Sequence, residues 1–158
     1  LPGRTLNRDD PVEGEDRNAL RLLRALLESH RPLDRLIVML GTNDCKARFD
    51  ARPSQIAAGL HAVVDQVAAS ALPGLPAPKL LIVSPPPLRE RGWLADMFSG
   101  GAARADALAA CYAEVARRRG VDFFDAGSVA AVDTMDGIHL GEHAHRALAE
   151  ALRGWVLA

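Results

Sequence analysis

Gly41-Thr42-Asn43-Asp44 is the first segment of the chain whose residue types could do chemistry. It directly follows an apolar run at residues 36–40, so the glycine permits a tight turn and the Asn43 amide could point into a crevice as a hydrogen-bond donor. A donor fixed in advance is what a developing oxyanion needs. Glycine, asparagine and aspartate are also ordinary turn residues, and the segment taken alone favours a plain turn.

Asp136-Gly137-Ile138-His139 is the second such segment and precedes the last predicted helix. A carboxylate three residues before a histidine can bond one ring nitrogen, fix the tautomer and leave the other nitrogen free to act as a base. The alternative is an exposed loop with a chance Asp and His. For this pair alone, that alternative is favoured.

The elements that would position both segments follow from the pattern of apolar residues. We predict strands at residues 36–40, 80–83 and 121–124, and helices at residues 15–30, 54–71, 102–119 and 142–157. The first two strands are apolar throughout, as in strands buried on both faces. Strands that alternate with helices indicate a parallel sheet with helices on both faces, whose ligands bind beyond the carboxyl ends of the strands.

Length and composition limit the function classes. The chain has 158 residues with a net charge of −1, which suits one domain spanning residues 1–158 and indicates no nucleic-acid partner. Apolar runs such as residues 36–40 are too short for a bilayer, so we expect no membrane partner. Cys45 and Cys111 have no metal-like spacing. This indicates a reducing compartment or simply unpaired thiols, and we expect a cytoplasmic protein.

Together the two segments occupy the carboxyl ends of predicted parallel strands, in the order found in the SGNH (GDSL) hydrolase superfamily. The chain resembles that superfamily from its first residues to its last. Residues 41–44 resemble its Gly-x-Asn-Asp block, residues 136–139 its Asp-x-x-His block, and Gly3 in Leu1-Pro2-Gly3-Arg4-Thr5 its glycine block. Longer strings resemble the aryl esterase/acyltransferase branch: Met39-Leu40-Gly41-Thr42-Asn43-Asp44, Val83-Ser84-Pro85-Pro86-Pro87-Leu88, Phe123-Phe124-Asp125-Ala126-Gly127-Ser128 and Asp136-Gly137-Ile138-His139.

This resemblance implies a three-layer α/β/α fold of flavodoxin-like type. It also implies hydrolysis of short-chain carboxylic esters, or transfer of their acyl groups, through an acyl-enzyme. His139 would be the base, Asp136 would orient it, and the Gly3 N–H and the Asn43 amide would form the oxyanion hole. No cofactor is implied, the partner is a small-molecule ester, and similar esterases lead us to expect a homo-oligomer.

The chain departs from the family pattern at the nucleophile, because the Gly-Asp-Ser block that carries the family's serine does not occur in it. Ser84 ends a strand, but the three prolines after it deny the strand-to-helix turn that presents a nucleophile. Cys45 allows a cysteine–histidine enzyme, although a free cysteine is more often a small buried hydrophobe. We therefore expect the serine upstream of Leu1, on a strand–helix–strand segment of roughly 40–60 residues that pairs with residues 36–40.

Further residues bear on substrate binding and on the question of a metal site. We predict substrate contacts at Thr42 and in an apolar wall formed by Trp93, Leu94, Met97 and Phe98, with a small cluster that pins a loop as the alternative for that wall. His139, His143 and His145 could suggest a metal site. We expect none, because His139 precedes the helix and His145 faces another direction.

Two other functions fit the same fold. A carbohydrate O-deacetylase would favour an open groove lined with aromatic residues, and the aromatic content of 4% argues against it. A catalytically dead SGNH-like binding domain would have lost its serine. Retention of Asn43, Asp136 and His139 argues against that loss, and an upstream Gly-Asp-Ser would decide between enzyme and binding domain.

Overall fold

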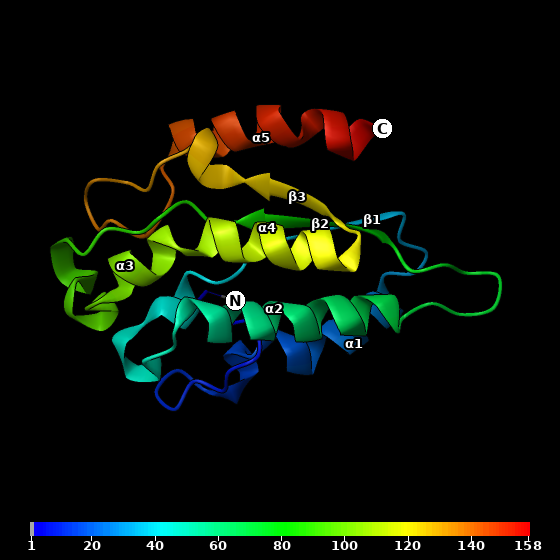
Figure 1. Cartoon of the computed structure of the whole chain (residues 1–158), viewed down its shortest axis with the longest axis horizontal. Coiled ribbons are helices and arrows are strands. Elements are labelled where there is room, and N and C mark those ends of the chain that lie inside the picture. The colour runs from blue at the N-terminus through cyan, green and yellow to red at the C-terminus, as the bar shows by residue number, and fades with distance from the viewer. Residues whose placement is uncertain (1) are drawn as a thin grey trace.

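A parallel sheet forms the middle layer of the computed structural model, which describes residues 2–158. In the described part of the chain the sheet has three strands in the order β1-β2-β3: β1 (Arg35–Val38), β2 (Lys79–Ser84) and β3 (Asp122–Asp125). The helices are α1 (Ala19–Ser29), α2 (Pro53–Ala68), α3 (Gly101–Asp106), α4 (Leu108–Arg119) and α5 (Glu142–Leu157). Helix α5 covers one face of the sheet, and α2 and α4 cover the other (Figure 1). The predicted three-layer α/β class is confirmed.

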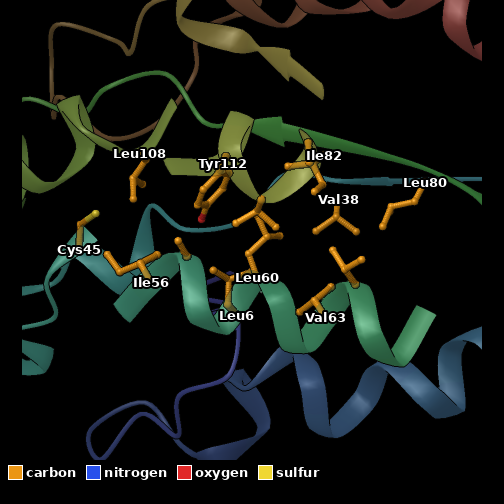
Figure 2. Packing of buried hydrophobic residues seen from close by; sticks show 14 of the residues in the cluster. Leu6, Val38, Cys45, Ile56, Leu60, Val63, Leu80, Ile82, Leu108 and Tyr112 are labelled. Carbon is orange, nitrogen blue, oxygen red and sulfur yellow. The ribbon is translucent and has the colours of Figure 1, made fainter. Parts of the chain in front are cut away.

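The alternation of side chains along β2 explains why both faces need helices. Leu80 and Ile82 pack into the larger core with α2 and α4, as Figure 2 shows. Leu81 and Val83 point the other way and pack against Leu148 of α5. Because side chains alternate across a strand, a strand that is apolar throughout stays stable only between two covering layers.

Strand β1 differs from its prediction in length and in burial. It ends at Val38 rather than residue 40, and it pairs only with β2 among the described residues. Val38 is buried in the larger core, but Ile37 and Met39 remain 37% and 39% exposed. The sequence prediction of burial on both faces is therefore wrong for this strand in the described structure. Helix α5 packs over β2 and β3 and contacts β1 at Arg35 through Trp155, but leaves Ile37 and Met39 partly exposed.

Two helix predictions also need correction. Residues 15–17 form a 3₁₀ turn, and α1 begins only at Ala19 because the side chain of Asn18 caps it by accepting a hydrogen bond from Leu20 N–H at 3.1 Å. The predicted helix at 102–119 is two helices. The break falls at Ala107, whose N–H donates to the carbonyl of Arg104 instead of continuing the α pattern.

The loops after the three strands gather at the carboxyl edge of the sheet, at the left of Figure 1. They carry residues 39–44, 85–92 and 126–140, which is where the sequence placed the candidate site. Between residues 2 and 158, no helix is both long enough and apolar enough to cross a membrane.

Candidate active site

A cavity of about 400 Å³ lies at this edge and brings both sequence motifs together. Its polar lining comprises Gly3, Arg4, Thr42, Asn43, His139 and His145. Its apolar walls include Met39 and Leu40 after β1 and Ile138 and Leu140 around the histidine. An apolar cavity with a few convergent polar groups is typical of a small-molecule site.

Asn43 owes its position to the turn at Gly41. This glycine has φ 124°, and a side chain there would collide with the hydroxyl of Tyr112. That buried hydroxyl donates a hydrogen bond to the carbonyl of Leu40 at 3.0 Å, which anchors the chain as it leaves β1. Asn43 then opens a short 3₁₀ turn, and its side-chain amide makes no hydrogen bond with any described residue. The amide is therefore available to a ligand in the cavity.

The loop that carries Gly3 is tied to the loop that carries Asn43. Leu6 N–H donates to the buried carboxylate of Asp44, at 3.0 Å from Oδ2. Further along, Lys46 Nζ lies 2.5 Å from Glu13 Oε1, and Arg48 Nη2 lies 2.8 Å from Asp10 Oδ2. The Gly3 N–H donates to no described residue. Gly3 and Asn43, whose N–H and side-chain amide have no partner among the described residues, thus line one cavity from segments about 40 residues apart.

Asp136 and His139 form the hydrogen bond that their spacing predicts. His139 Nδ1 lies 2.7 Å from Asp136 Oδ2, and Asp136 Oδ1 accepts the backbone N–H groups of Ile138 and His139 at 2.8 and 2.9 Å. Burial opposes ionisation of Asp136, but the bonds from His139 and Ile138 outweigh it and lower the pKa of this carboxyl to about 2. His139 Nε2 has no hydrogen-bond partner among the described residues, so it is free to take a proton in the cavity.

Gly137 allows the histidine loop to close. It has φ 72°, and a side chain there would collide with the backbone carbonyl of Arg89. Arg89 N–H donates to the Gly137 carbonyl at 2.8 Å, and Asp133 N–H donates to the His139 carbonyl at 2.7 Å. The first bond holds this loop against the loop after β2, and the second closes the histidine loop on itself.

Neither internal nucleophile candidate can act in this cavity. Ser84 is fully buried and its Oγ donates to Asp125 Oδ1 at 3.0 Å. Cys45 is also fully buried; that burial and the nearby charge of Asp44 raise the pKa of its thiol to about 12. The thiol therefore stays protonated and weakly nucleophilic near neutral pH. No serine or cysteine is among the described residues that line the cavity.

The structure does not bring the predicted apolar wall into this cavity. Trp93 is 69% exposed, whereas Phe98 is buried in the larger core. Leu94 packs against that core and Met97 is partly exposed. The loop turns Phe98 inward toward α3, which matches the alternative of a cluster that pins the loop. A substrate contact stays a prediction for these four residues, and the placement of Phe98 argues against it. Thr42, in contrast, lines the cavity beside Asn43.

Two polar side chains of the cavity escaped the sequence prediction, as did its apolar walls. His145, expected to face another direction, lines the same cavity as His139, because the first turn of α5 packs beside the histidine loop. Arg4 also lines it, and no motif signalled that position apart from its place next to Gly3. Within residues 2–158, no group of three or more His, Cys, Asp or Glu is arranged to hold a metal ion.

Comparisons with known proteins agree with this geometry. The model of the GDSL-like lipase/acylhydrolase family matches residues 2–147. An aryl esterase from M. smegmatis is 44% identical, covers 99% of this chain and 75% of its own, and superposes with a TM-score of 0.93. A carbohydrate acetylesterase from Sinorhizobium meliloti is 39% identical with the same coverage and a TM-score of 0.94.

A more distant structure shows the fold alone. A GDSL-like lipase from Bacteroides thetaiotaomicron is 14% identical, covers 98% of this chain and 72% of its own, and has a TM-score of 0.74. No curated protein gives a significant sequence match. The family match spans the segments that carry Asn43 and His139, and the chain therefore belongs to the GDSL-like lipase/acylhydrolase family of the SGNH superfamily, a family of carboxylic ester hydrolases.

Proposed function

We propose that the protein is a serine esterase that hydrolyses short-chain carboxylic esters, or transfers their acyl groups, through an acyl-enzyme. The observation that carries the proposal is the convergence of His139, backed by Asp136 at 2.7 Å, with the free Gly3 N–H and the free Asn43 amide around one cavity. This set contains a base, a group that orients it and two donors for an oxyanion, which are the parts that acyl transfer requires.

In the proposed mechanism a serine attacks the ester carbonyl while His139 Nε2 takes its proton. Gly3 N–H and the Asn43 amide bind the oxyanion that forms, and Asp136 stabilises the imidazolium through Nδ1. His139 then gives the proton to the leaving alkoxide, which leaves an acyl-serine. Water completes hydrolysis by the same route, and an alcohol in its place completes acyl transfer.

We further propose that the nucleophilic serine lies on a segment outside residues 1–158 that adds a strand beside β1. Two observations support this placement. The described cavity residues include no serine or cysteine. Among the described residues β1 pairs on one edge only, and Ile37 of β1 and the following Met39 are partly exposed. Unpaired apolar edges are normally covered in stable proteins, so a further strand would both close the sheet and carry the nucleophile to the cavity.

A fluorophosphonate probe tests the mechanism. The full-length protein should be labelled on one serine outside residues 1–158, whereas residues 1–158 alone should be inert or aggregate. His139→Ala should abolish labelling and lower kcat on 4-nitrophenyl acetate by at least about 10³-fold. His143→Ala, a matched exposed histidine outside the cavity, should change neither. A label on Ser84 or Cys45, or an active isolated chain, would exclude the proposed nucleophile.

A carbohydrate O-deacetylase is the second candidate, favoured by the 39% identity to the carbohydrate acetylesterase. Comparing kcat/KM for acetylated oligosaccharides and for aryl acetates separates the two enzymes. A catalytically dead binding domain would show neither turnover nor labelling.

Self-association and a cytoplasmic location stay predictions. Cys45 and Cys111 are both free, which suits a reducing compartment.

A further inference from the structure

Lys46 is a buried lysine whose ammonium group is held by two carboxylates of a distant loop. Its Nζ lies 2.5 Å from Glu13 Oε1 and 3.4 Å from Asp10 Oδ2. Arg48 Nη2 lies 2.5 Å from the same glutamate oxygen and 2.8 Å from the same aspartate oxygen. A buried ion is stable only when it is paired, and loss of one partner leaves an uncompensated charge. These four side chains therefore hold the two loops in one relative position.

The Gly3 backbone lies directly against Glu13, at one end of this cluster. Glu13 Oε2 occupies the space that a side chain on residue 3 would need, so that a Cβ on Gly3 would collide with it. The main chain of Glu13 is itself held, because Asp10 Oδ1 accepts the N–H groups of Val12 and Glu13 at 2.9 and 3.0 Å. The carboxylate of Glu13 thus limits the position of the Gly3 backbone.

The turn that carries Asn43 lies at the other end of the cluster. Lys46 follows this turn directly, and its backbone N–H donates to the Asn43 carbonyl at 3.2 Å. Lys46 therefore closes the turn through its main chain and binds Glu13 through its side chain. A continuous series of contacts runs from Gly3 through these two charged residues to Asn43.

In the proposed mechanism the Gly3 N–H and the Asn43 amide bind one oxyanion together, so the distance between them affects the rate. Donors of this kind act by being fixed before the reaction, and a displacement of about 1 Å can cost about 10²-fold in rate. We propose that Glu13 and Lys46 are positioning residues that set the spacing of these two donors. Neither residue lines the described cavity, so both act through their neighbours. This inference rests on the proposed function.

Glu13→Gln tests the inference in a protein that carries the proposed serine. Glutamine keeps the size of the side chain but removes the charge that pairs with Lys46, so kcat on 4-nitrophenyl acetate should fall by about 10–100-fold while KM changes by less than about threefold. Arg21→Gln breaks an exposed ion pair with Asp9 of the same N-terminal loop and should change neither constant. An unchanged kcat in folded Glu13→Gln, or an effect on KM alone, would overturn the inference.

A double-mutant comparison separates positioning from a general loss of stability. Asn43→Ala removes one of the two donors, so their spacing loses its importance. In that background Glu13→Gln should lower kcat by less than about threefold. A fall by the same factor in both backgrounds would show a structural defect and refute the positioning role. Glu13→Asp, which keeps the charge and shortens the side chain, should show the same dependence on Asn43 and replaces Glu13→Gln if that variant does not fold.

Hydrogen exchange keeps the test independent of turnover. If the protein hydrolyses no ester, the proposed function fails, and the exchange rate of the Lys46 N–H still reports on the Asn43 turn. This amide should exchange at least about tenfold faster in Glu13→Gln than in wild type, while the amides of β2 keep their rates. Equal rates at Lys46 in the two proteins would refute the coupling of Glu13 to the turn even in an active esterase.

Discussion

The buried carboxylate of Asp44 should make the protein less stable as pH rises from about 4 to about 7. Asp44 is fully buried in the described structure, and its main partners are Leu6 N–H at 3.0 Å and Arg8 Nε at 3.8 Å. Burial penalises the charged form, and these contacts offset only part of that penalty, so the pKa of Asp44 is raised from 3.8 to about 7.

The direction and size of the effect follow from proton linkage. Between pH 4 and 7 the folded protein holds a proton on Asp44 that the unfolded chain has released, so folding loses stability as pH rises through this window and levels off above it. The shift of about 3 pKa units corresponds to at most about 4 kcal/mol. Asp44→Asn keeps the shape and an acceptor for Leu6 N–H but removes the charge.

We therefore expect the free energy of unfolding of Asp44→Asn, relative to wild type, to rise by up to about 3 kcal/mol between pH 4.5 and pH 8. Urea denaturation followed by circular dichroism across this range measures the difference. Asp50→Asn, an exposed carboxylate at the end of the next turn, is the matched control and should show no such trend. A variant that loses stability relative to wild type between pH 4.5 and 8 would refute the reasoning, because it would show that Leu6 and Arg8 fully compensate the buried charge.

Three further outcomes follow from the site in a protein that carries the proposed serine. Asp136→Asn should lower kcat by about 10⁴-fold with the fold intact, because an amide favours the wrong tautomer of His139; equal kcat at pH 7 would remove Asp136 from the mechanism. Asn43→Ala should cost about 10²–10³ in kcat, or about 2.7–4 kcal/mol, with little change in KM, whereas an effect on KM alone would indicate a ground-state contact. Ser84→Ala should keep its activity but lose about 1 kcal/mol of stability in denaturant titration, since Asp125 loses a buried donor, and inactivation of the folded variant would contradict this assignment.

Local patterns in the sequence were sufficient for the elements and for one half of the site. Apolar runs and helical spacing predict the parallel sheet and most helices, because burial depends on the period of the apolar side chains. The bond between Asp136 and His139 could also be predicted, since the two residues lie three apart in one turn. Where local signals were weak or conflicting, as at Asn18 and Ala107, the predicted helix boundaries were wrong.

Contacts between distant segments were decided by the tertiary structure. Gly3 and Asn43 share a cavity because Asp44 accepts the N–H of Leu6 across 38 residues of sequence. His145 reaches the same cavity through the packing of α5, and Phe98 turns into the core instead of the cavity. The period of the apolar side chains predicts helices and strands, but it carries no information about which loops come together in the folded protein. The amino-acid sequence therefore determined the chemical groups and the strand ends on which they sit, whereas long-range packing decided which of those groups face one ligand.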